Sequence, residues 1–318
     1  MSIVEAAPPG RARARPGGAR FGGRRWIEIG LFVGPAIALY VIFLLVPVVQ
    51  AVHYSFYSWT GLGPLSDFVG LGNYREAFGD RFFRQAMEHN GILIVLSIGL
   101  QLPLALGVAL LLNRPLRGRR IFRLIFFAPY VLSEAITAVL FLQILQPGGL
   151  VDAGLRSVGL GGLVQLWLAN LQLVFYTLFV VITWKYIGFA IILLLAGLQG
   201  VPSELHEAAA MDGASSWESL RYVTIPLLGP TIRIWIFLSV IGSIQLFDLV
   251  WIMTLGGPAG ASSTMATYMV DKGINSYRIG YATTVATILF GVCFVISMLY
   301  QIFVLRRDNL TGTARMAG

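Results

Sequence analysis

Three ionisable side chains stand inside segments that are otherwise apolar: Glu134, Lys185 and Asp248. A charge held away from water costs free energy, so such residues are usually kept for a polar pathway or for a specific partner. Glu134 and Lys185 fall near the middle of their segments. We therefore expect them to lie at a similar depth and to pair or to share a polar cavity. An ion pair that only fixes helix packing would explain them equally well.

The segment around Asp248 also carries uncharged polar and aromatic residues, among them Ser239, Ser243, Gln245 and Trp251. Hydroxyl, amide and aromatic groups together suit a sugar, whose hydroxyls need hydrogen bonds and whose C–H patches pack on rings. The same polar groups could instead bond one helix to another, and Asp248 could cap a helix. We hypothesise that these groups, with Glu134 and Lys185, form a substrate pathway whose candidate residues are Glu134, Lys185, Gln245, Asp248 and Trp251.

A polar loop over residues 201–226 has the pattern of two short helices with a break between them. Ser203 is a suitable N-cap for the first helix, and Glu204 stands in its first turn, where the helix dipole favours a negative charge. Asp212 and Gly213 predict the end of that helix, because glycine suits the left-handed cap position.

The second helix of the loop is predicted to begin after Ser215, which has capping-box spacing with Glu218. In the first helix, Ala208 and Ala209 would let another surface approach the backbone closely, and Glu207, like Glu204, could pair with basic groups on a partner. A short, capped helix of this kind can transmit a push. A helix that only covers the membrane surface is the alternative interpretation.

The composition indicates that membrane-spanning helices position these polar and charged side chains. The chain has 318 residues, of which 57% are hydrophobic and 12% are charged, against about one quarter charged in soluble proteins. A membrane-spanning helix needs roughly 20 apolar residues. The sequence therefore predicts an all-α membrane protein with six transmembrane helices, at about residues 29–52, 91–112, 121–145, 173–196, 231–255 and 279–305.

Basic residues give the expected orientation. With both termini in the cytoplasm, 16 Lys and Arg lie on the cytoplasmic side and six on the outer side, in agreement with the positive-inside rule. Residues 1–26 are expected to be a disordered basic cytoplasmic tail able to touch membrane lipid, residues 27–305 the transmembrane domain, and residues 306–318 a second cytoplasmic tail. Because the basic residues gather at membrane ends, the net charge of +8 does not indicate a nucleic-acid partner.

The loop resembles a known motif. Glu207-Ala208-Ala209, then Gly213 four residues after Ala209, then Val223-Thr-Ile-Pro226, is similar to the EAA motif of permeases from binding-protein-dependent ABC importers. Further segments resemble the sugar-uptake branch of that family, in particular the first of the two permeases in maltose and glycerol-3-phosphate systems. These segments are Phe32-Val-Gly-Pro-Ala36, Gly70-Leu-Gly-Asn-Tyr74, Trp184-Lys-Tyr-Ile-Gly-Phe189 and Leu255-Gly-Gly-Pro258.

The resemblance implies a type I ABC importer permease in the bacterial inner membrane. Its partners would be a second homologous permease subunit, a dimer of ABC ATPases and an extracytoplasmic sugar-binding protein. The ATPase would dock on Glu204, Glu207, Ala208, Ala209, Asp212 and Gly213. The sequence has no phosphate-binding G-x-x-x-x-G-K-[ST] loop. The chain is therefore expected to bind no cofactor and to be no enzyme, with ATP used by the partner.

A di- or oligosaccharide is the expected cargo, with glycerol-3-phosphate or another small solute as the alternative within the family. A phosphate dianion would need several basic groups in the path, and the spans hold only Lys185. A secondary transporter driven by an ion gradient, or a membrane anchor that transports nothing, are further alternatives. The three histidines and the single Cys293 form no metal-binding or catalytic pattern.

Overall fold

The computed structural model describes residues 23–305, with side chains described from Gly30 to Phe303. Both predicted tails, apart from residues 23–26 and their helical backbone, lie outside the described residues. Within the described chain the structure is helical, and the β pairing is confined to an isolated bridge between Tyr57 and Phe68. The helices are α1 Gly23–Tyr40, η1 Val41–Leu45, α2 Val46–Tyr54, α3 Gly72–Gly79, α4 Arg81–Leu96, η2 Ser97–Gln101, α5 Leu102–Asn113, α6 Arg119–Val131, α7 Glu134–Leu145, α8 Leu150–Ser157, η3 Gly161–Leu163, α9 Val174–Gln199, α10 Ser203–Met211, α11 Ser216–Ser219, η4 Leu220–Thr224, α12 Ile225–Leu227, α13 Gly229–Gln245, α14 Asp248–Thr254, α15 Met265–Val270, η5 Asp271–Asn275, α16 Ile279–Tyr300 and η6 Gln301–Leu305.

The described chain divides between Gln50 and Ala51 into two compact units, and most of the first span belongs to the first of them. The span runs over Gly30–Tyr54, and the apolar window that identifies it has no residue buried inside the protein. A helix that exposes apolar side chains all round is adapted to lipid or to another subunit.

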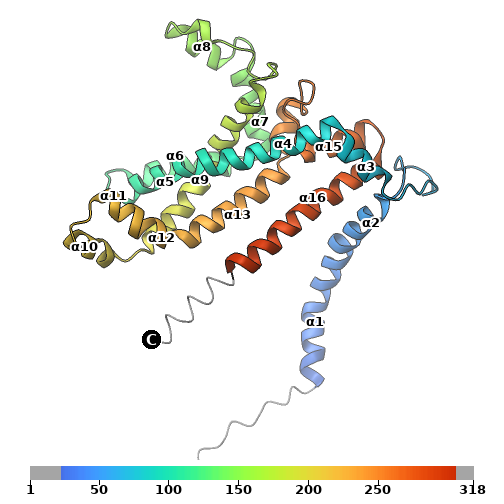
Figure 1. The fold of residues 1–318 in the computed structure, drawn as a ribbon, viewed down its shortest axis with the longest axis horizontal. Coiled ribbons are helices and arrows are strands. Elements are labelled where there is room, and N and C mark those ends of the chain that lie inside the picture. The colour runs from blue at the N-terminus through green and yellow to red at the C-terminus, as the bar shows by residue number, and fades with distance from the viewer. Residues whose placement is uncertain (1–22, 306–318) are drawn as a thin grey trace, which may run out of the picture. The chain divides into compact units, whose positions relative to one another are not determined.

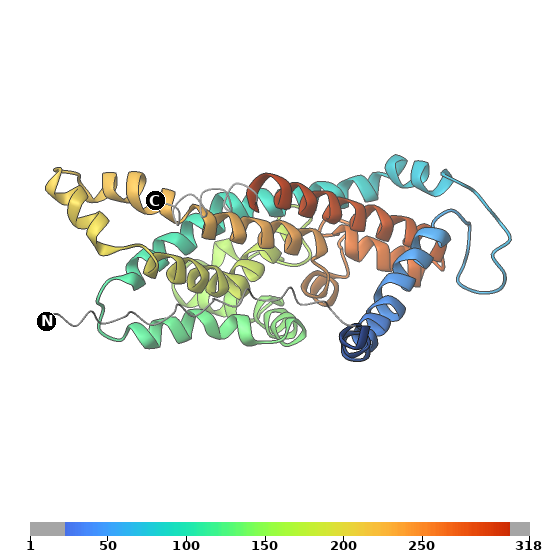
Figure 2. The ribbon, with the colours of Figure 1, turned by 90° about the horizontal axis from the view of Figure 1, so that it is seen from below.

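Four further helical segments of the second unit are long and apolar enough to cross a membrane. They are Arg81–Asn113, Val174–Gln199, Gly229–Thr254 and Ile279–Phe303. Each overlaps a predicted span, and Arg81–Asn113 begins ten residues before the predicted start at residue 91. Helix α13 contacts both α16 and α4. Figures 1 and 2 show α13 running beside α16.

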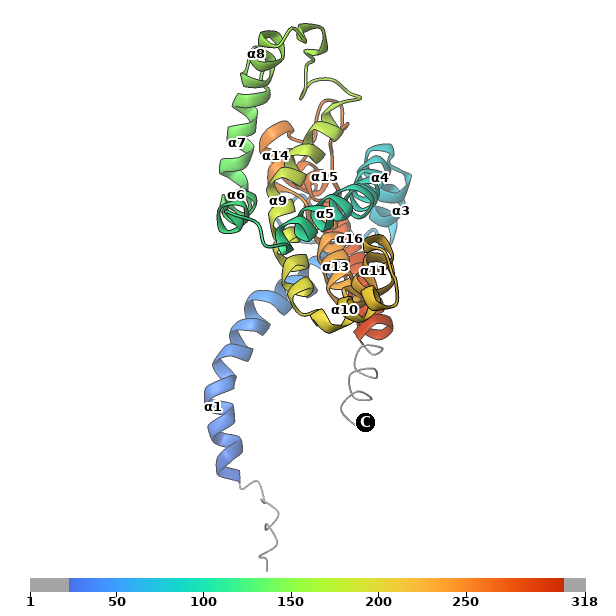
Figure 3. The same ribbon diagram turned by 90° about the vertical axis from the view of Figure 1, so that its left-hand side faces the viewer.

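The predicted third span is not a straight helix. It consists of α6 and α7, which meet at a bend of 98° between Val131 and Glu134. Leu132 and Ser133 have extended backbone there, and the Ser133 hydroxyl caps α7 by accepting from the Ile136 amide at 3.2 Å. Figure 3 shows α7, followed by α8, leaving the end of α6 in a new direction. Glu134 therefore begins a helix at the bend. The prediction from the sequence, that Glu134 lies near the middle of a continuous span, is replaced by this position.

The fifth span is also interrupted, at Leu246 and Phe247 between α13 and α14. The Asn90 side chain donates to the Ser243 carbonyl at 2.6 Å and accepts from the Met265 amide at 2.9 Å. The Thr264 hydroxyl donates to the Leu246 carbonyl at 2.8 Å. These contacts supply partners for backbone groups that the break leaves free, which a membrane-embedded chain requires.

Helix α9 is the centre of the second unit. Its side chains belong to two buried clusters, one shared with α7 and α14 and the other with α5 and α13. Helices α6 and α9 pack so closely at Gly188 that a Cβ atom there would lie 1.9 Å from the Phe126 carbonyl oxygen. Only glycine fits this crossing, so Gly188 fixes how near the two helices approach.

Candidate functional site: a cavity with serine, glutamine and aromatic side chains, and a two-helix loop

A cavity of about 280 Å³ lies among α4, η2, α6, α9 and α13. These elements bring together residues far apart in the sequence. The cavity is lined by uncharged side chains throughout, namely Leu93, Ser97, Gln101, Tyr130, Ile182, Tyr186, Phe189, Trp235, Leu238, Ser239, Gly242, Ser243 and Leu246.

Four polar side chains on the cavity wall have free hydrogen-bonding capacity. Ser97 and Gln101 stand at the two ends of the π-helical turn η2 and are each only 4% exposed. Ser239 and Ser243 are four residues apart on α13 and so lie on one face of it. Within residues 23–305 none of these four side chains has a protein hydrogen-bond partner. Ser97 and Gln101 are buried, and Ser239 and Ser243 are half-buried. Buried polar groups are normally satisfied, so this wall is suited to a polar ligand.

Aromatic rings provide the other part of the wall. The Tyr130 ring stacks on Phe189 with centroids 5.1 Å apart and meets Tyr186 edge-on at 6.2 Å. Trp235, 3% exposed, lies across from them on α13. Rings of this kind pack against apolar patches of a ligand while polar neighbours set its orientation.

The charged residues predicted for the pathway lie at the bend beside the cavity. Lys185 is 3% exposed, and its ammonium donates to the Leu132 carbonyl oxygen at 2.5 Å. Glu134 accepts a hydrogen bond from the Tyr186 hydroxyl. The two charged groups make no ion pair with each other among the described residues. Lys185 instead meets the carboxyl end of α6 and Glu134 occupies the first turn of α7, positions that the helix dipoles favour. Both residues thus stabilise the bend.

The other predicted pathway residues lie around the break in the fifth span. Gln245 ends α13 and Asp248 begins α14, and both are exposed. Trp251 stacks on Phe247 with centroids 5.5 Å apart. None of the three lines the cavity. Ser97 and Gln101 line the cavity. We missed them in the sequence because they lie in an uncharged segment. Their spacing of four residues within that segment is the pattern that could have revealed them.

The loop over residues 201–226 forms the two predicted short helices. Helix α10 covers Ser203–Met211, with Gly213 after it in the left-handed region at φ 81°. The predicted capping box is present, with Ser215 and Glu218 bonded reciprocally at the start of α11. The expected N-cap at Ser203 is wrong, since Ser203 is already the first helical residue and Pro202 precedes it without a side-chain bond.

The two helices are held to one another. The His206 Nδ1 atom and the Ser219 hydroxyl are 3.0 Å apart, which links α10 to α11. Glu204, Glu207, Ala208, Asp212 and Gly213 are all exposed, and Ala209 is half-buried. The loop therefore has its two helices linked by a side-chain contact and offers an exposed surface with acidic and small residues.

Comparison with known proteins shows the family. Residues 101–309 match the model for the binding-protein-dependent transport system inner membrane component. The chain belongs to this family. It is therefore a membrane permease subunit of the transport-system type, as the sequence resemblance predicted.

The permease is similar along most of its length to several relatives. It is 34% identical to the lactose transport system permease protein LacF of Rhizobium radiobacter, over 87% of this chain and 94% of LacF. It is 30% identical to the trehalose/maltose transport system permease protein MalF of Thermococcus litoralis, over 87% of this chain and 94% of MalF. A chain of the bacterial alginate ABC transporter, crystallised with a periplasmic protein that holds an alginate pentasaccharide, has the same fold. The TM-score is 0.76 at 23% identity, over 89% of the permease and 96% of that chain.

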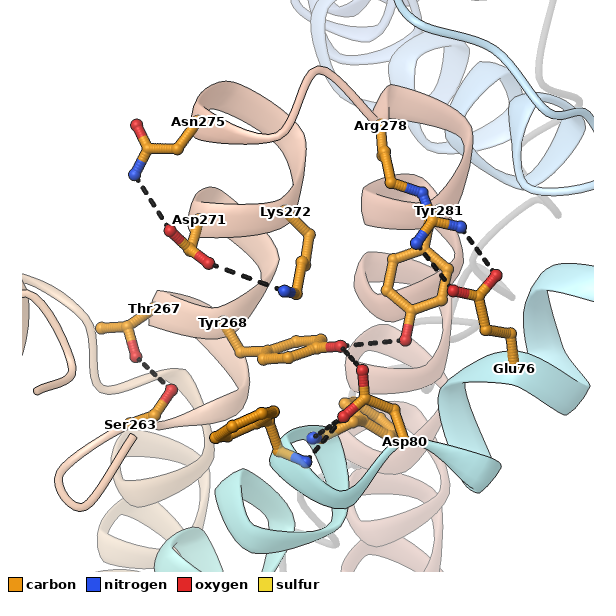
Figure 4. Close-up of polar contacts among 12 residues, drawn as sticks. Glu76, Asp80, Ser263, Thr267, Tyr268, Asp271, Lys272, Asn275, Arg278 and Tyr281 are labelled. Atoms are coloured by element: carbon orange, nitrogen blue, oxygen red, sulfur yellow. Dashed lines mark hydrogen bonds and ion pairs between the residues drawn. The ribbon is translucent and has the colours of Figure 1, made fainter. Parts of the chain in front are cut away.

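A network of polar side chains joins α3 and α4 to α15 and α16 (Figure 4). Arg278 donates two hydrogen bonds of 2.6 Å to the carboxylate of Glu76. The Tyr268 hydroxyl donates to Asp80 at 2.7 Å and lies 3.0 Å from the Tyr281 hydroxyl. A second cavity of about 260 Å³ lies beside Tyr268. The network ties the start of the second span to the start of the sixth.

This network shifts the pKa values of its carboxyl groups. The hydrogen bonds from Arg278 lower the pKa of Glu76 against the opposing effect of burial, and the same bonds raise the pKa of Arg278. Burial alone would raise the pKa of Asp80, but the bonds from Tyr268 and from the Phe82 and Phe83 amides bring it below its ordinary value. Both carboxylates are thus held in the charged form.

Proposed function

We propose that this permease forms one half of the translocation path of an ATP-driven importer for a neutral di- or oligosaccharide. The observation that carries the proposal is the cavity wall, where unpartnered Ser97, Gln101, Ser239 and Ser243 face a site that aromatic rings also line. Sugars are bound by this combination of hydrogen-bonding groups and ring faces. The absence of any charged side chain from the cavity lining favours a neutral cargo over glycerol-3-phosphate.

The named relatives support a saccharide cargo, and LacF and MalF support a neutral one, whereas alginate is an acidic polysaccharide. LacF and MalF are named for lactose and for trehalose or maltose, and the alginate transporter was crystallised with an oligosaccharide on its periplasmic protein. In the proposed cycle, a soluble binding protein delivers the sugar at the outer face. The cavity then receives it while the cytoplasmic side is closed.

The energy would come from a separate ATPase dimer. Both termini and the loop 201–226 would lie in the cytoplasm, on the side where that dimer binds. The exposed acidic face of α10 and the small residues Ala208 and Ala209 suit docking into a cleft with basic groups. The capping box and the bond from His206 to Ser219 support transmission of force from the ATPase to η4 and α13. A second homologous permease would cover the apolar faces that this chain leaves open.

Uptake by the complete transporter reconstituted in vesicles tests the proposal. We expect ATP-dependent uptake of a neutral oligosaccharide when the cognate binding protein is supplied, and no uptake of glycerol-3-phosphate. Transport that follows an ion gradient without the ATPase would contradict the mechanism. Normal co-purification of the ATPase with a Glu207→Arg, Gly213→Val variant would contradict the role of the loop.

A further inference from the structure

The second cavity, of about 260 Å³, shares no lining residue with the cavity proposed to carry the sugar. It lies among the start of α4, the loop after α14, helix α15 and the start of η5. Its lining residues are Phe82, Leu255, Gly256, Gly257, Ala259, Gly260, Ser263, Thr267, Tyr268, Asp271 and Lys272. The loop 201–226 precedes the fifth span, whereas this cavity lies at the end of that span. With the loop in the cytoplasm, as proposed, the second cavity faces the outside.

The wall of the second cavity holds an aromatic ring against a glycine-rich loop. The ring is that of Phe82, whose side chain remains 48% exposed. Gly256 and Gly260 have left-handed backbone, with φ of 80° and 79°, a conformation that glycine adopts without strain. A Cβ atom at Gly260 would lie 3.0 Å from the Phe82 ring, so glycine at this position makes room for the ring. The Phe82 ring is therefore part of the wall and is still accessible to a ligand.

Two opposite charges also line the second cavity. The Lys272 ammonium and the Asp271 carboxylate are 3.9 Å apart, with side chains 26% and 46% exposed, and this separation is too long for a hydrogen bond. The ammonium lies over the Tyr268 ring at 5.4 Å from its centroid (Figure 4), and within residues 23–305 it makes no hydrogen bond. An ammonium has three N–H donors and a carboxylate has only acceptors. The pair can therefore donate to one group of a ligand and accept from its neighbour.

We propose that the second cavity is an outer site for one hexopyranose ring of a neutral saccharide. One ring hydroxyl donates to Asp271 and the adjacent hydroxyl accepts from Lys272, which gives two charge-assisted hydrogen bonds, while a C–H patch of the sugar packs on Phe82. The two charges balance each other, which favours a neutral ligand over an ion. The volume is below the roughly 300–1,000 Å³ of sites for drug-sized ligands and so suits a single ring. This inference rests on the proposed function for the outward direction of the cavity and for the saccharide cargo.

Thiol alkylation in the complete transporter, reconstituted in nanodiscs without ATP or binding protein, tests the outer site. Ala259 lines it and is exposed, whereas the native Cys293 is buried, so Ala259→Cys supplies an accessible thiol. We expect the two probes, maltose and lactose, to slow alkylation saturably, about threefold at twice the dissociation constant, and open-chain sorbitol to have little effect. Leu255→Cys, a second exposed lining position, should respond in the same way. Ser276→Cys, exposed but outside the lining, is the matched control and should not respond.

Lys272→Gln or Asp271→Asn, each combined with Ala259→Cys, should raise the sugar concentration needed for protection about tenfold, as expected for the loss of a hydrogen bond to a charged group. Unchanged protection in both variants would overturn the proposal. Equal slowing at Ser276→Cys, or no protection by either sugar at both lining positions, would also overturn it.

Uptake by Gln101→Leu separates this inference from the proposed function. Normal uptake by that variant, with protection retained at the outer site, would contradict only the cavity that contains Gln101. Reduced uptake by that variant, with no protection at the outer site in the otherwise unaltered transporter, would contradict only the outer site.

Discussion

At the scale of single residues, Gly188 sets the contact between α6 and α9. Its hydrogen atom faces the Phe126 carbonyl where a Cβ would come within 1.9 Å. The adjacent Lys185 and Tyr186 hold the bend between α6 and α7. A change at this glycine should therefore disturb both the packing of α6 and the wall of the cavity.

Gly188→Ala should destabilise the permease by about 1–3 kcal/mol or more, because the neighbouring atoms are backbone and cannot rotate away. The unfolding midpoint in detergent measures the effect. Gly91→Ala is the matched control, since nothing lies within 4 Å of a Cβ built at that helical position. Equal midpoints for the two variants would show that the close crossing is absent.

Glu76 makes stability depend on pH. Its pKa is lowered in the folded protein by the bonds from Arg278, so the stabilisation is present above its ordinary value of 4.5 and is lost as the pH falls through the lowered value. The unfolding midpoint should therefore drop on going from neutral to acidic pH, and drop less in Glu76→Gln. Glu88→Gln, at an exposed position on α4, should retain the full dependence. A profile for Glu76→Gln identical to that of the unaltered protein would contradict this account.

At the scale of elements, the short helix α11 depends on its cap. It is the first turn, Ser216–Ser219, of a helical run that continues without a break into η4, and the bonds between Ser215 and Glu218 satisfy groups at the start of that run. Ser215→Ala should cost about 1 kcal/mol locally and speed amide hydrogen exchange over residues 216–221. Ser216→Ala, which removes a neighbouring exposed hydroxyl outside the cap, should leave the exchange close to that of the unaltered chain. Equal exchange in both variants would mean that the cap does not hold the helix.

Hydropathy predicted where the apolar segments lie, but not their direction. The bend after Val131 and the break at Leu246 occur inside runs whose average composition stays apolar. What stabilises them comes from distant residues, since Asn90 bonds to the Ser243 carbonyl and Lys185 to the Leu132 carbonyl. Such contacts depend on three-dimensional packing. The loop over 201–226 was predictable because capping is decided by near neighbours along the chain.

At the scale of the whole molecule, the candidate site was only partly accessible from sequence. From the sequence, we assigned the substrate pathway to charged residues because they are rare in an apolar chain. In the structure, Glu134 and Lys185 instead form hydrogen bonds at the bend beside the cavity. The uncharged Ser97 and Gln101 line it. Hydropathy averages hide such residues, and only the meeting of η2 with α13 shows that their side chains share one space.

The central claim is that this cavity carries the sugar, and the uptake of oligosaccharide by the reconstituted transporter tests it most directly. Gln101→Leu removes a buried amide from the cavity wall, whereas Gln245→Leu makes the same change at an exposed position outside it. We predict that Gln101→Leu lowers uptake about tenfold, as expected for the loss of one to two ligand hydrogen bonds, and that Gln245→Leu transports normally. Normal uptake with Gln101→Leu and loss with Gln245→Leu would contradict the account and return the pathway to the break in the fifth span.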